Sequence, residues 1–288
     1  MQNKGNKLPD FLIVGVQKAG TTWLQLLLSS HPNIYMADQE LHYFDKNKNF
    51  DKGEAWYESQ FEKANQGQLV GEKTPDYFWT NCDNATSKNI CQNKAHRIST
   101  ALPEAKLIVI LREPVSRFLS AWNHNVRRGR LRSDISLDAL LKEESYYVQR
   151  MLKVGCYATQ LKEFRRYYAS NQLLVIFQDE VKSDPDNLIR KVCDFLNVDA
   201  ALFNGSVNNR DKVNSFGSTL FGTRILKYLP SILQEVWLRF DKMILTKSGL
   251  KTVKYPQLTE TERVYLTEYY RSEMEELNAL IPLPQGWL

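Results

Sequence analysis

The sequence has little cysteine, and none of it is spaced for a metal. Four cysteines occur in 288 residues, without a CxxC pair. This spacing excludes a zinc ribbon and a dense disulfide framework. Cys82 and Cys91 flank a polar loop and would pair in an oxidising compartment, whereas reduced thiols are expected in the cytosol.

Long apolar runs, repeats and flexible linkers are also missing. No stretch approaches the roughly 18 apolar residues that span a membrane. The first residues, MQNKGNKLPD, contain no apolar signal core. Taken as a native start, they predict a cytoplasmic protein without membrane insertion. The even composition predicts a single domain over residues 1–288.

The chain is organised around the stretch 11–31, FLIVGVQKAGTTWLQLLLSSH. Phe11 to Val14 predicts a short buried strand, residues 15–22 form a glycine-containing loop, and apolar residues at helical spacing follow. A strand, loop and helix in this order make an anion cradle, because amides at the helix start point outward and the helix dipole favours negative charge. For this loop alone, an ordinary glycine turn with a surface lysine is the alternative.

The loop differs from the phosphate loop of ATPases. That motif needs four residues between its glycines and ends in Lys-Ser/Thr, whereas Lys18 precedes Gly20 here. A kinase or NTPase is therefore disfavoured but stays an alternative.

The motif GxxKxGTT after the first strand resembles the 5'-phosphosulfate loop of sulfotransferases, particularly the branch of heparan sulfate 3-O-sulfotransferases and their bacterial relatives. The resemblance implies 3'-phosphoadenosine 5'-phosphosulfate (PAPS) as donor, its desulfated form PAP as product, and no required metal. It also implies that Lys18 stabilises the leaving phosphate. The nucleotide-binding residues would be Lys18, Ala19, Gly20, Thr21, Thr22 and Trp23.

A second group of candidate residues follows a short strand expected over residues 34–36. The residues 39–45 after this strand interleave charged and aromatic side chains, which is typical either of the lining of an active site or of a half-exposed strand edge. The resemblance decides, because the 3-O-sulfotransferases carry Glu-x-His-Phe-Phe-Asp there with the glutamate as catalytic base. Glu40, His42 and Asp45 match, with His42 as competing base and Asp45 facing the substrate.

A third candidate, Lys73, ends the strand expected from Leu69. The relatives share the sequence Glu-Lys-Thr-Pro-x-Tyr-Phe, with its lysine in the active site. By this resemblance Lys73 would neutralise charge on the transferring group or hold the acceptor. On its own it would be an ordinary surface lysine.

The clearest central strand, Lys106 to Leu111, ends at Arg112. Ligands bind at the carboxyl edge of open parallel sheets. A helix starts at Pro114 and carries Ser120. By the same resemblance, Arg112 and Ser120 match the pair of residues that binds the 3'-phosphate of the donor. A P-loop ATPase would need an aspartate here for magnesium.

Further elements follow in alternation. We expect helices over 136–152 and 157–168, a strand over 173–177 and a helix opened by Asp184-Pro185. A last helix begins with a capping box at Thr259 and is expected to pack through Val264, Tyr265, Tyr269 and Leu277. Tyr157 suits core packing or a ligand contact equally. Residues 206–219 lie where relatives place a loop over the 3'-phosphate. The arginines at 127–132 fit a solvated helix end better than a binding patch.

These observations predict a three-layer α/β domain around a largely parallel sheet. The net charge of +5 suits an anionic ligand. The resemblance implies a hydroxyl-bearing acceptor, a small molecule or a glycan, without nucleic acid. The 3-O-sulfotransferases have an arginine where Thr22 stands, and its loss favours a small molecule. A non-catalytic nucleotide- or polyanion-binding protein is the other alternative.

Overall fold

The structure is a computed structural model that describes residues 8–80, 94–143, 145–203 and 255–288. These residues fall into two compact units. The first contains 8–80, 94–113, 156–203 and 273–288, and the second contains the remainder. The expected single domain stays a prediction. The cysteines 82 and 91 and the segment 206–219 lie outside the described residues.

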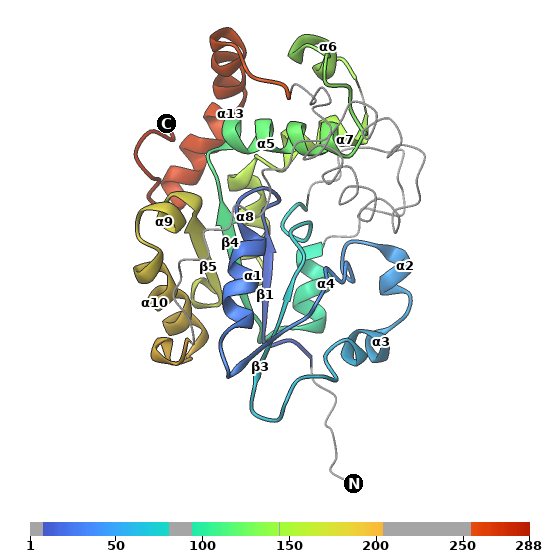
Figure 1. The fold of residues 1–288 in the computed structure, drawn as a ribbon, viewed down its shortest axis with the longest axis vertical. Coiled ribbons are helices and arrows are strands. Elements are labelled where there is room, and N and C mark those ends of the chain that lie inside the picture. Colours follow the sequence, from blue (N-terminus) through green and yellow to red (C-terminus); the bar gives the residue numbers. More distant parts are fainter. Residues whose placement is uncertain (1–7, 81–93, 144, 204–254) are drawn as a thin grey trace, which may run out of the picture. The chain divides into compact units, whose positions relative to one another are not determined.

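A five-stranded sheet forms the centre of the first unit (Figure 1). Its order is β2-β3-β1-β4-β5, and every neighbouring pair is parallel. The strands are β1 (Phe11–Gly15), β2 (Ile34–Met36), β3 (Leu69–Lys73), β4 (Lys106–Leu111) and β5 (Leu173–Phe177). Helices flank this sheet, which confirms the predicted α/β architecture.

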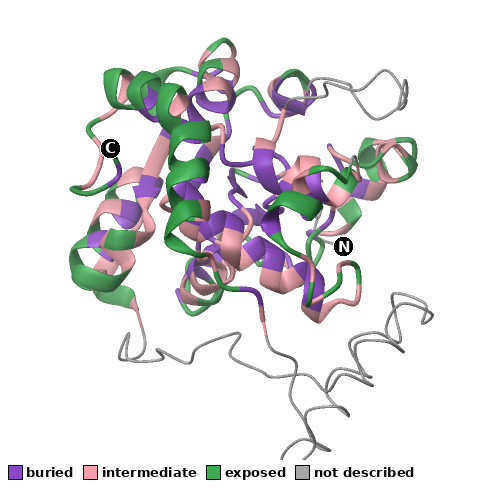
Figure 2. Cartoon of the chain, turned by 90° about the horizontal axis from the view of Figure 1, so that it is seen from above, coloured by how far each residue is buried: buried purple, intermediate pink, exposed green. Residues whose placement is uncertain are grey.

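The central strands β1 and β4 are mostly apolar because neighbouring layers cover the sheet. Every residue of β1 is buried, and so is every residue of β4 except the first. Figure 2 colours the buried residues purple and the exposed residues green. Two glycines permit close approach. A Cβ atom on Gly71 would lie 2.3 Å from Cζ of Phe11, and one on Gly15 would lie 2.5 Å from Cβ of Phe78. Larger side chains there would separate β1 from its neighbours.

The helices of the first unit connect and cover the strands. They are α1 (Thr21–Ser29), α2 (Asn47–Phe50), α3 (Glu54–Ser59), α4 (Lys94–Ala101), α8 (Tyr157–Arg165), α9 (Gln178–Ser183) and α10 (Pro185–Leu196), with 3-10 turns at Ser170–Gln172 and Ala200–Leu202. The start of α10 follows its sequence signals, because Oδ1 of Asp184 accepts from the amide of Asn187 at 3.1 Å. The sequence reasoning missed α2, α4 and α9.

The second unit is helical. It contains α5 (Pro114–Arg127), α6 (Leu137–Leu141), α7 (Tyr146–Lys153) and the first part of α13 (Glu260–Leu280). The single helix expected over 136–152 is wrong, because two helices occupy this range. Ser145 explains the break, since its hydroxyl accepts from the amide of Val148 and begins a new helix.

The last helix, α13, begins as predicted but buries a different face. Glu262 accepts from the amide of Thr259 at 2.8 Å, and the Thr259 hydroxyl accepts from the amide of Glu262 at 3.3 Å, which is a capping box. Of the four residues expected to pack, Leu277 is buried as predicted, whereas Val264, Tyr265 and Tyr269 are exposed. The buried residues are Leu266, Tyr270, Met274 and Leu277, which recur at steps of three and four.

Within the residues that the structure describes, no helix combines the length and the apolar character needed to cross a membrane.

Candidate functional site

The predicted site residues of the first unit gather at one edge of its sheet. All five strands run parallel, so their carboxyl ends meet at the same edge. The loop with Lys18 follows β1, the segment with Glu40 follows β2, Lys73 ends β3, and Arg112 follows β4. Because β3, β1 and β4 are direct neighbours, these segments are placed to line one site.

The loop after β1 has the backbone of an anion cradle. Lys18 and Gly20 have positive φ angles of 75° and 109°, and Gly20 is the N-cap of α1. No side chain caps this helix, so the amides of its first turn can bind an external anion. Nη1 of Arg112 donates to the carbonyl oxygen of Lys18 at 3.2 Å. The structure therefore places Arg112 beside the loop that carries Lys18.

At the same sheet edge as this loop, Glu40 forms a charged cluster with two cations. Nζ of Lys73 lies 2.6 Å from Oε1 of Glu40, and Nε2 of His42 lies 3.5 Å from Oε2. Burial by itself raises the pKa of Glu40, but the hydrogen bond from His42 and the Lys73 ammonium outweigh it and lower the pKa below its usual value. Glu40 is therefore ionised at neutral pH, and its side chain remains 39% exposed.

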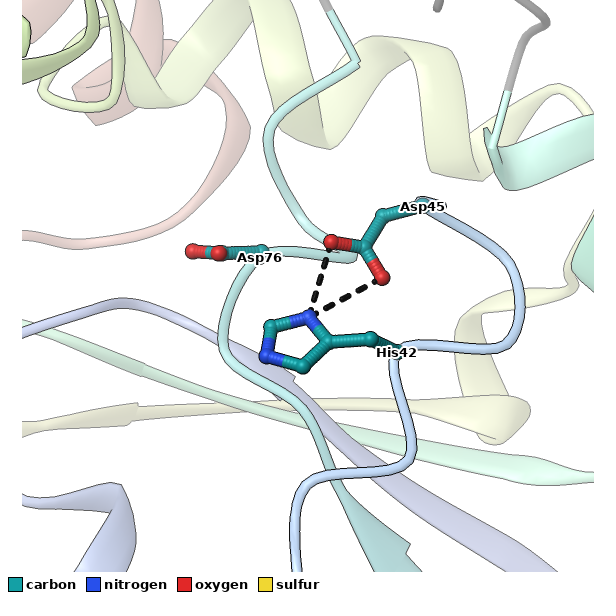
Figure 3. A group of neighbouring side chains, drawn as sticks. All are labelled: His42, Asp45 and Asp76. Atoms are coloured by element: carbon teal, nitrogen blue, oxygen red, sulfur yellow. Dashed lines mark hydrogen bonds and ion pairs between the residues drawn. The ribbon is translucent and has the colours of Figure 1, made fainter. Parts of the chain in front are cut away.

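His42 is held as a cation by carboxylates on both of its nitrogens. Nδ1 donates to the two oxygens of Asp45 at 2.9 and 3.2 Å (Figure 3). Burial alone lowers the pKa of His42, but the hydrogen bonds with Asp45 and Glu40 raise it to about 9. A protonated imidazole cannot accept a proton, so Glu40 is the better placed base of the two candidates.

His42, Asp45 and Asp76 offer ligand atoms within 4.8 Å of one another, close enough to be considered for a metal ion (Figure 3). A metal needs a deprotonated imidazole nitrogen. In this structure Nδ1 already binds Asp45, and the raised pKa keeps the ring protonated. His42 and Asp45 therefore form a hydrogen-bonded pair, and Asp76 adds a neighbouring negative charge.

Comparison with known proteins decides the family. A model of the "Sulfotransferase domain" matches residues 8–278. The chain belongs to the sulfotransferase family. Heparan sulfate glucosamine 3-O-sulfotransferase 3A1 of Mus musculus is 32% identical over 204 residues, which cover 67% of this sulfotransferase domain and 47% of that protein. The bifunctional heparan sulfate N-deacetylase/N-sulfotransferase 4 of the same species is 28% identical over an alignment of 309 positions, gaps included. This alignment covers 98% of this sulfotransferase and 31% of that protein.

Solved structures agree on the fold. The crystal structure of a sulfotransferase from Alicyclobacillus acidocaldarius has a TM-score of 0.70 and 23% identity, and it covers 98% of this sulfotransferase and 99% of that chain. A mouse sulfotransferase solved with PAP has a TM-score of 0.51. This sulfotransferase domain spans about half the length of the 3-O-sulfotransferases that it matches.

The two other predicted site residues of the sulfotransferase are Tyr157 and Ser120. Tyr157 is fully buried on α8, and its hydroxyl donates to the carbonyl oxygen of Arg112 at 2.7 Å. This position favours core packing for Tyr157, with an indirect effect on Arg112. Ser120 lies on α5 in the second unit, so its pairing with Arg112 stays a prediction.

Sequence reasoning missed the residues that support the Glu40 cluster. Glu72, Thr74 and Tyr77 lie beneath the segment of residues 40–45 and bind one another. All three stand in the Glu-Lys-Thr-Pro-x-Tyr-Phe motif, for which a role was predicted only for the lysine, Lys73. Strand alternation is the signal that was available, because it places Glu72 on the face opposite Lys73.

Proposed function

We propose that this sulfotransferase moves the sulfuryl group of PAPS to a hydroxyl group of an acceptor. The observation that supports this most is the Glu40–Lys73 pair, which lies at the same sheet edge as the anion-binding loop. A base beside a cradle for an anionic donor is the arrangement that in-line transfer requires.

The residues of the loop would bind the donor's 5' end. The uncapped amides of Thr21, Thr22 and Trp23 start α1, where a phosphosulfate is favoured by the helix dipole. PAPS, when bound, supplies an activated sulfuryl group whose bond to phosphate breaks. Lys18 neutralises the negative charge that grows on the departing phosphate oxygen, an effect that is largest in the transition state.

Glu40 would act on the acceptor. Its ionised carboxylate takes the proton of the acceptor hydroxyl as that oxygen bonds to sulfur, and later gives the proton to water. Lys73 keeps Glu40 ionised, while His42 and Asp45 hold the carboxylate in place. The products are a sulfate ester and PAP.

The acceptor is proposed as a hydroxyl-bearing small molecule or a glycan. The curated relatives are named for heparan sulfate glucosamine, an anionic glycan. Thr22 carries no charge for such a polymer, which favours the small molecule. We propose a cytoplasmic location as well, and it is tested by fractionation of the native host.

A direct assay tests the activity. The protein is incubated with PAPS and a panel of hydroxyl acceptors, including desulfated heparan fragments and phenols, and PAP release is measured. We expect acceptor-dependent release without added magnesium. Thermal shifts separate the alternatives, since a kinase or NTPase is stabilised by ATP with magnesium rather than by PAP. A non-catalytic polyanion binder responds to heparin and releases no PAP with any acceptor.

A further inference from the structure

Two backbone amides of the segment 40–45 donate to side-chain hydroxyls. The amide of His42 donates to Oγ1 of Thr74 at 3.4 Å, and the amide of Tyr43 donates to the hydroxyl of Tyr77 at 2.9 Å. The segment lies outside the sheet, so it has no strand partner for these groups. Side chains supply the acceptors that backbone amides need when they are buried.

Both hydroxyls in turn donate to one carboxylate. Oε1 of Glu72 accepts from Thr74 at 2.8 Å and from Tyr77 at 2.7 Å, and Oε2 accepts from the hydroxyl of Tyr57. Burial raises the pKa of Glu72 on balance, although the hydrogen bonds from Tyr57, Tyr77 and Thr74 lower it. In its ionised state the carboxylate offers only acceptor sites, so each O–H bond points towards it. The lone pairs of Thr74 and Tyr77 are then free to face the two amides.

The network is fully enclosed. Glu72, Thr74, Tyr57 and Tyr77 are all completely buried. Burial, with the charge of Glu72, raises the pKa of both tyrosines well above the usual value, so their hydroxyls stay protonated and act as donors. Hydrogen bonds in such an interior are strong and cooperative.

The two adjacent residues of β3 hold the same segment in different ways. Lys73 binds the side chain of Glu40 directly, at 2.6 Å. Glu72 points to the opposite face of the strand and reaches the backbone at positions 42 and 43 through its two hydroxyl partners. The carboxylate of Glu40 is two residues away from the first of these anchored amides.

We propose that Glu72 is a positioning residue, which holds Glu40 in place for proton transfer by fixing the backbone of residues 42 and 43 through Thr74 and Tyr77. The inference deepens the proposed sulfuryl transfer and rests on it. Other contacts hold the segment's carbonyl groups, since Asn49 donates to that of Leu41 at 2.9 Å. Loss of one hydroxyl therefore alters geometry and leaves the segment folded.

Tyr77→Phe and Tyr57→Phe form a matched pair that tests this. Each removes one donor to Glu72 and keeps its ring, which packs against Phe44 in both cases. Only Tyr77 also accepts the amide of Tyr43. We expect kcat to fall about tenfold or more in Tyr77→Phe and less than about threefold in Tyr57→Phe, because small displacements of a catalytic group are costly. The KM for PAPS stays constant in both.

A second measurement does not depend on activity. The titration of His42 is followed by NMR of its ring protons. The pKa of this ring depends on its distance from three carboxylates that face it, those of Glu40, Asp45 and Asp76. It also depends on the Lys73 ammonium, which lies beyond Glu40. We expect its pKa, raised to about 9 in the native protein, to move towards the usual value in Tyr77→Phe. Tyr57→Phe should leave the pKa unchanged.

Thr74 gives an independent check on the same network. Thr74→Val removes the acceptor for the His42 amide and should lower kcat and the pKa of His42, whereas Thr74→Ser restores the hydroxyl and should restore both.

Equal losses of kcat in Tyr77→Phe and Tyr57→Phe, with equal shifts in melting temperature, would overturn the positioning role. An unchanged His42 titration in Tyr77→Phe and Thr74→Val would overturn it as well. If no acceptor is sulfated by the native protein, the proposed function fails, and the titration still decides whether Glu72 fixes the segment.

Discussion

The loop after β1 and the segment after β2 lie at the same edge of the sheet but are built differently. The loop uses backbone geometry, with positive φ angles at Lys18 and Gly20 and an uncapped helix start. The segment 40–45 uses side chains, which bind its amides and surround Glu40 with charges. An anion subsite can therefore be formed by the backbone of one short stretch of sequence, whereas a positioned base needs residues from several elements.

Removing the base should have the largest effect. Glu40→Gln keeps the size of the side chain and removes its capacity to accept a proton, so kcat for transfer should fall about a thousandfold. PAP affinity, measured by calorimetry, should stay within about twofold, because the loop binds the nucleotide without Glu40. Asp38→Asn is the control, since this exposed carboxylate pairs with Lys63 at the surface. Normal turnover by Glu40→Gln would remove it as the base.

Removing the cation of the loop should come next. Lys18→Ala should lower kcat about a hundredfold, because charge on the leaving oxygen is no longer neutralised. PAP release under saturating PAPS measures this, and circular dichroism confirms the fold. Lys63→Ala, on an exposed lysine at the surface, is the matched control. If both lysine variants retain full activity, the loop binds the nucleotide without assisting its departure.

A smaller change is expected when the partner of the base is removed. Lys73 lowers the pKa of Glu40, so Lys73→Met should raise that pKa. The acid limb of the kcat/KM profile reports ionisation of the base, and it should therefore move to higher pH, with a loss of about tenfold at neutral pH. The loss of kcat/KM should be largest on the acid side of the profile, because His42 still favours the ionised form of Glu40 at neutral pH. A profile that keeps the native acid limb would show that another group controls it.

The smallest effect concerns stability. A group whose folded pKa is raised, as for His42 at about 9, contributes stability that is complete below its usual pKa near 6.5. This contribution is lost as the pH rises through about 9, and it amounts to no more than about 3 kcal/mol. The melting temperature of the native protein should fall over this range more than that of His42→Gln. Parallel curves would contradict the ion pairs described for His42.

Local patterns predicted most of the fold. The strands at 34–36, 106–111 and 173–177 have the expected bounds, because a buried parallel strand is a short apolar run ended by polar or turn residues. The capping box at Thr259 was also read correctly. The inward face of α13 was not, because aromatic residues occur on both sides of this helix and only packing chooses between them.

The candidate site could be predicted in part. Lys18, Glu40 and Lys73 stand in motifs, and the structure brings Glu40 and Lys73 into contact. The ionisation states could not be read from the sequence, because the pKa of His42 depends on carboxylates that only the fold places beside it. Glu72 was missed for the same reason, since a buried carboxylate is recognisable only with its donors.

The alternation of Glu72 and Lys73 on β3 also protects the alignment of the sheet. If β3 shifted by one residue against β1, the ammonium would enter an aromatic interior beside two phenols, and the carboxylate would face Glu40. Misaligned pairings would thus bury an unmatched cation and oppose two anions, both of which are unfavourable. Two neighbouring charges of opposite sign make the correct strand pairing electrostatically selective.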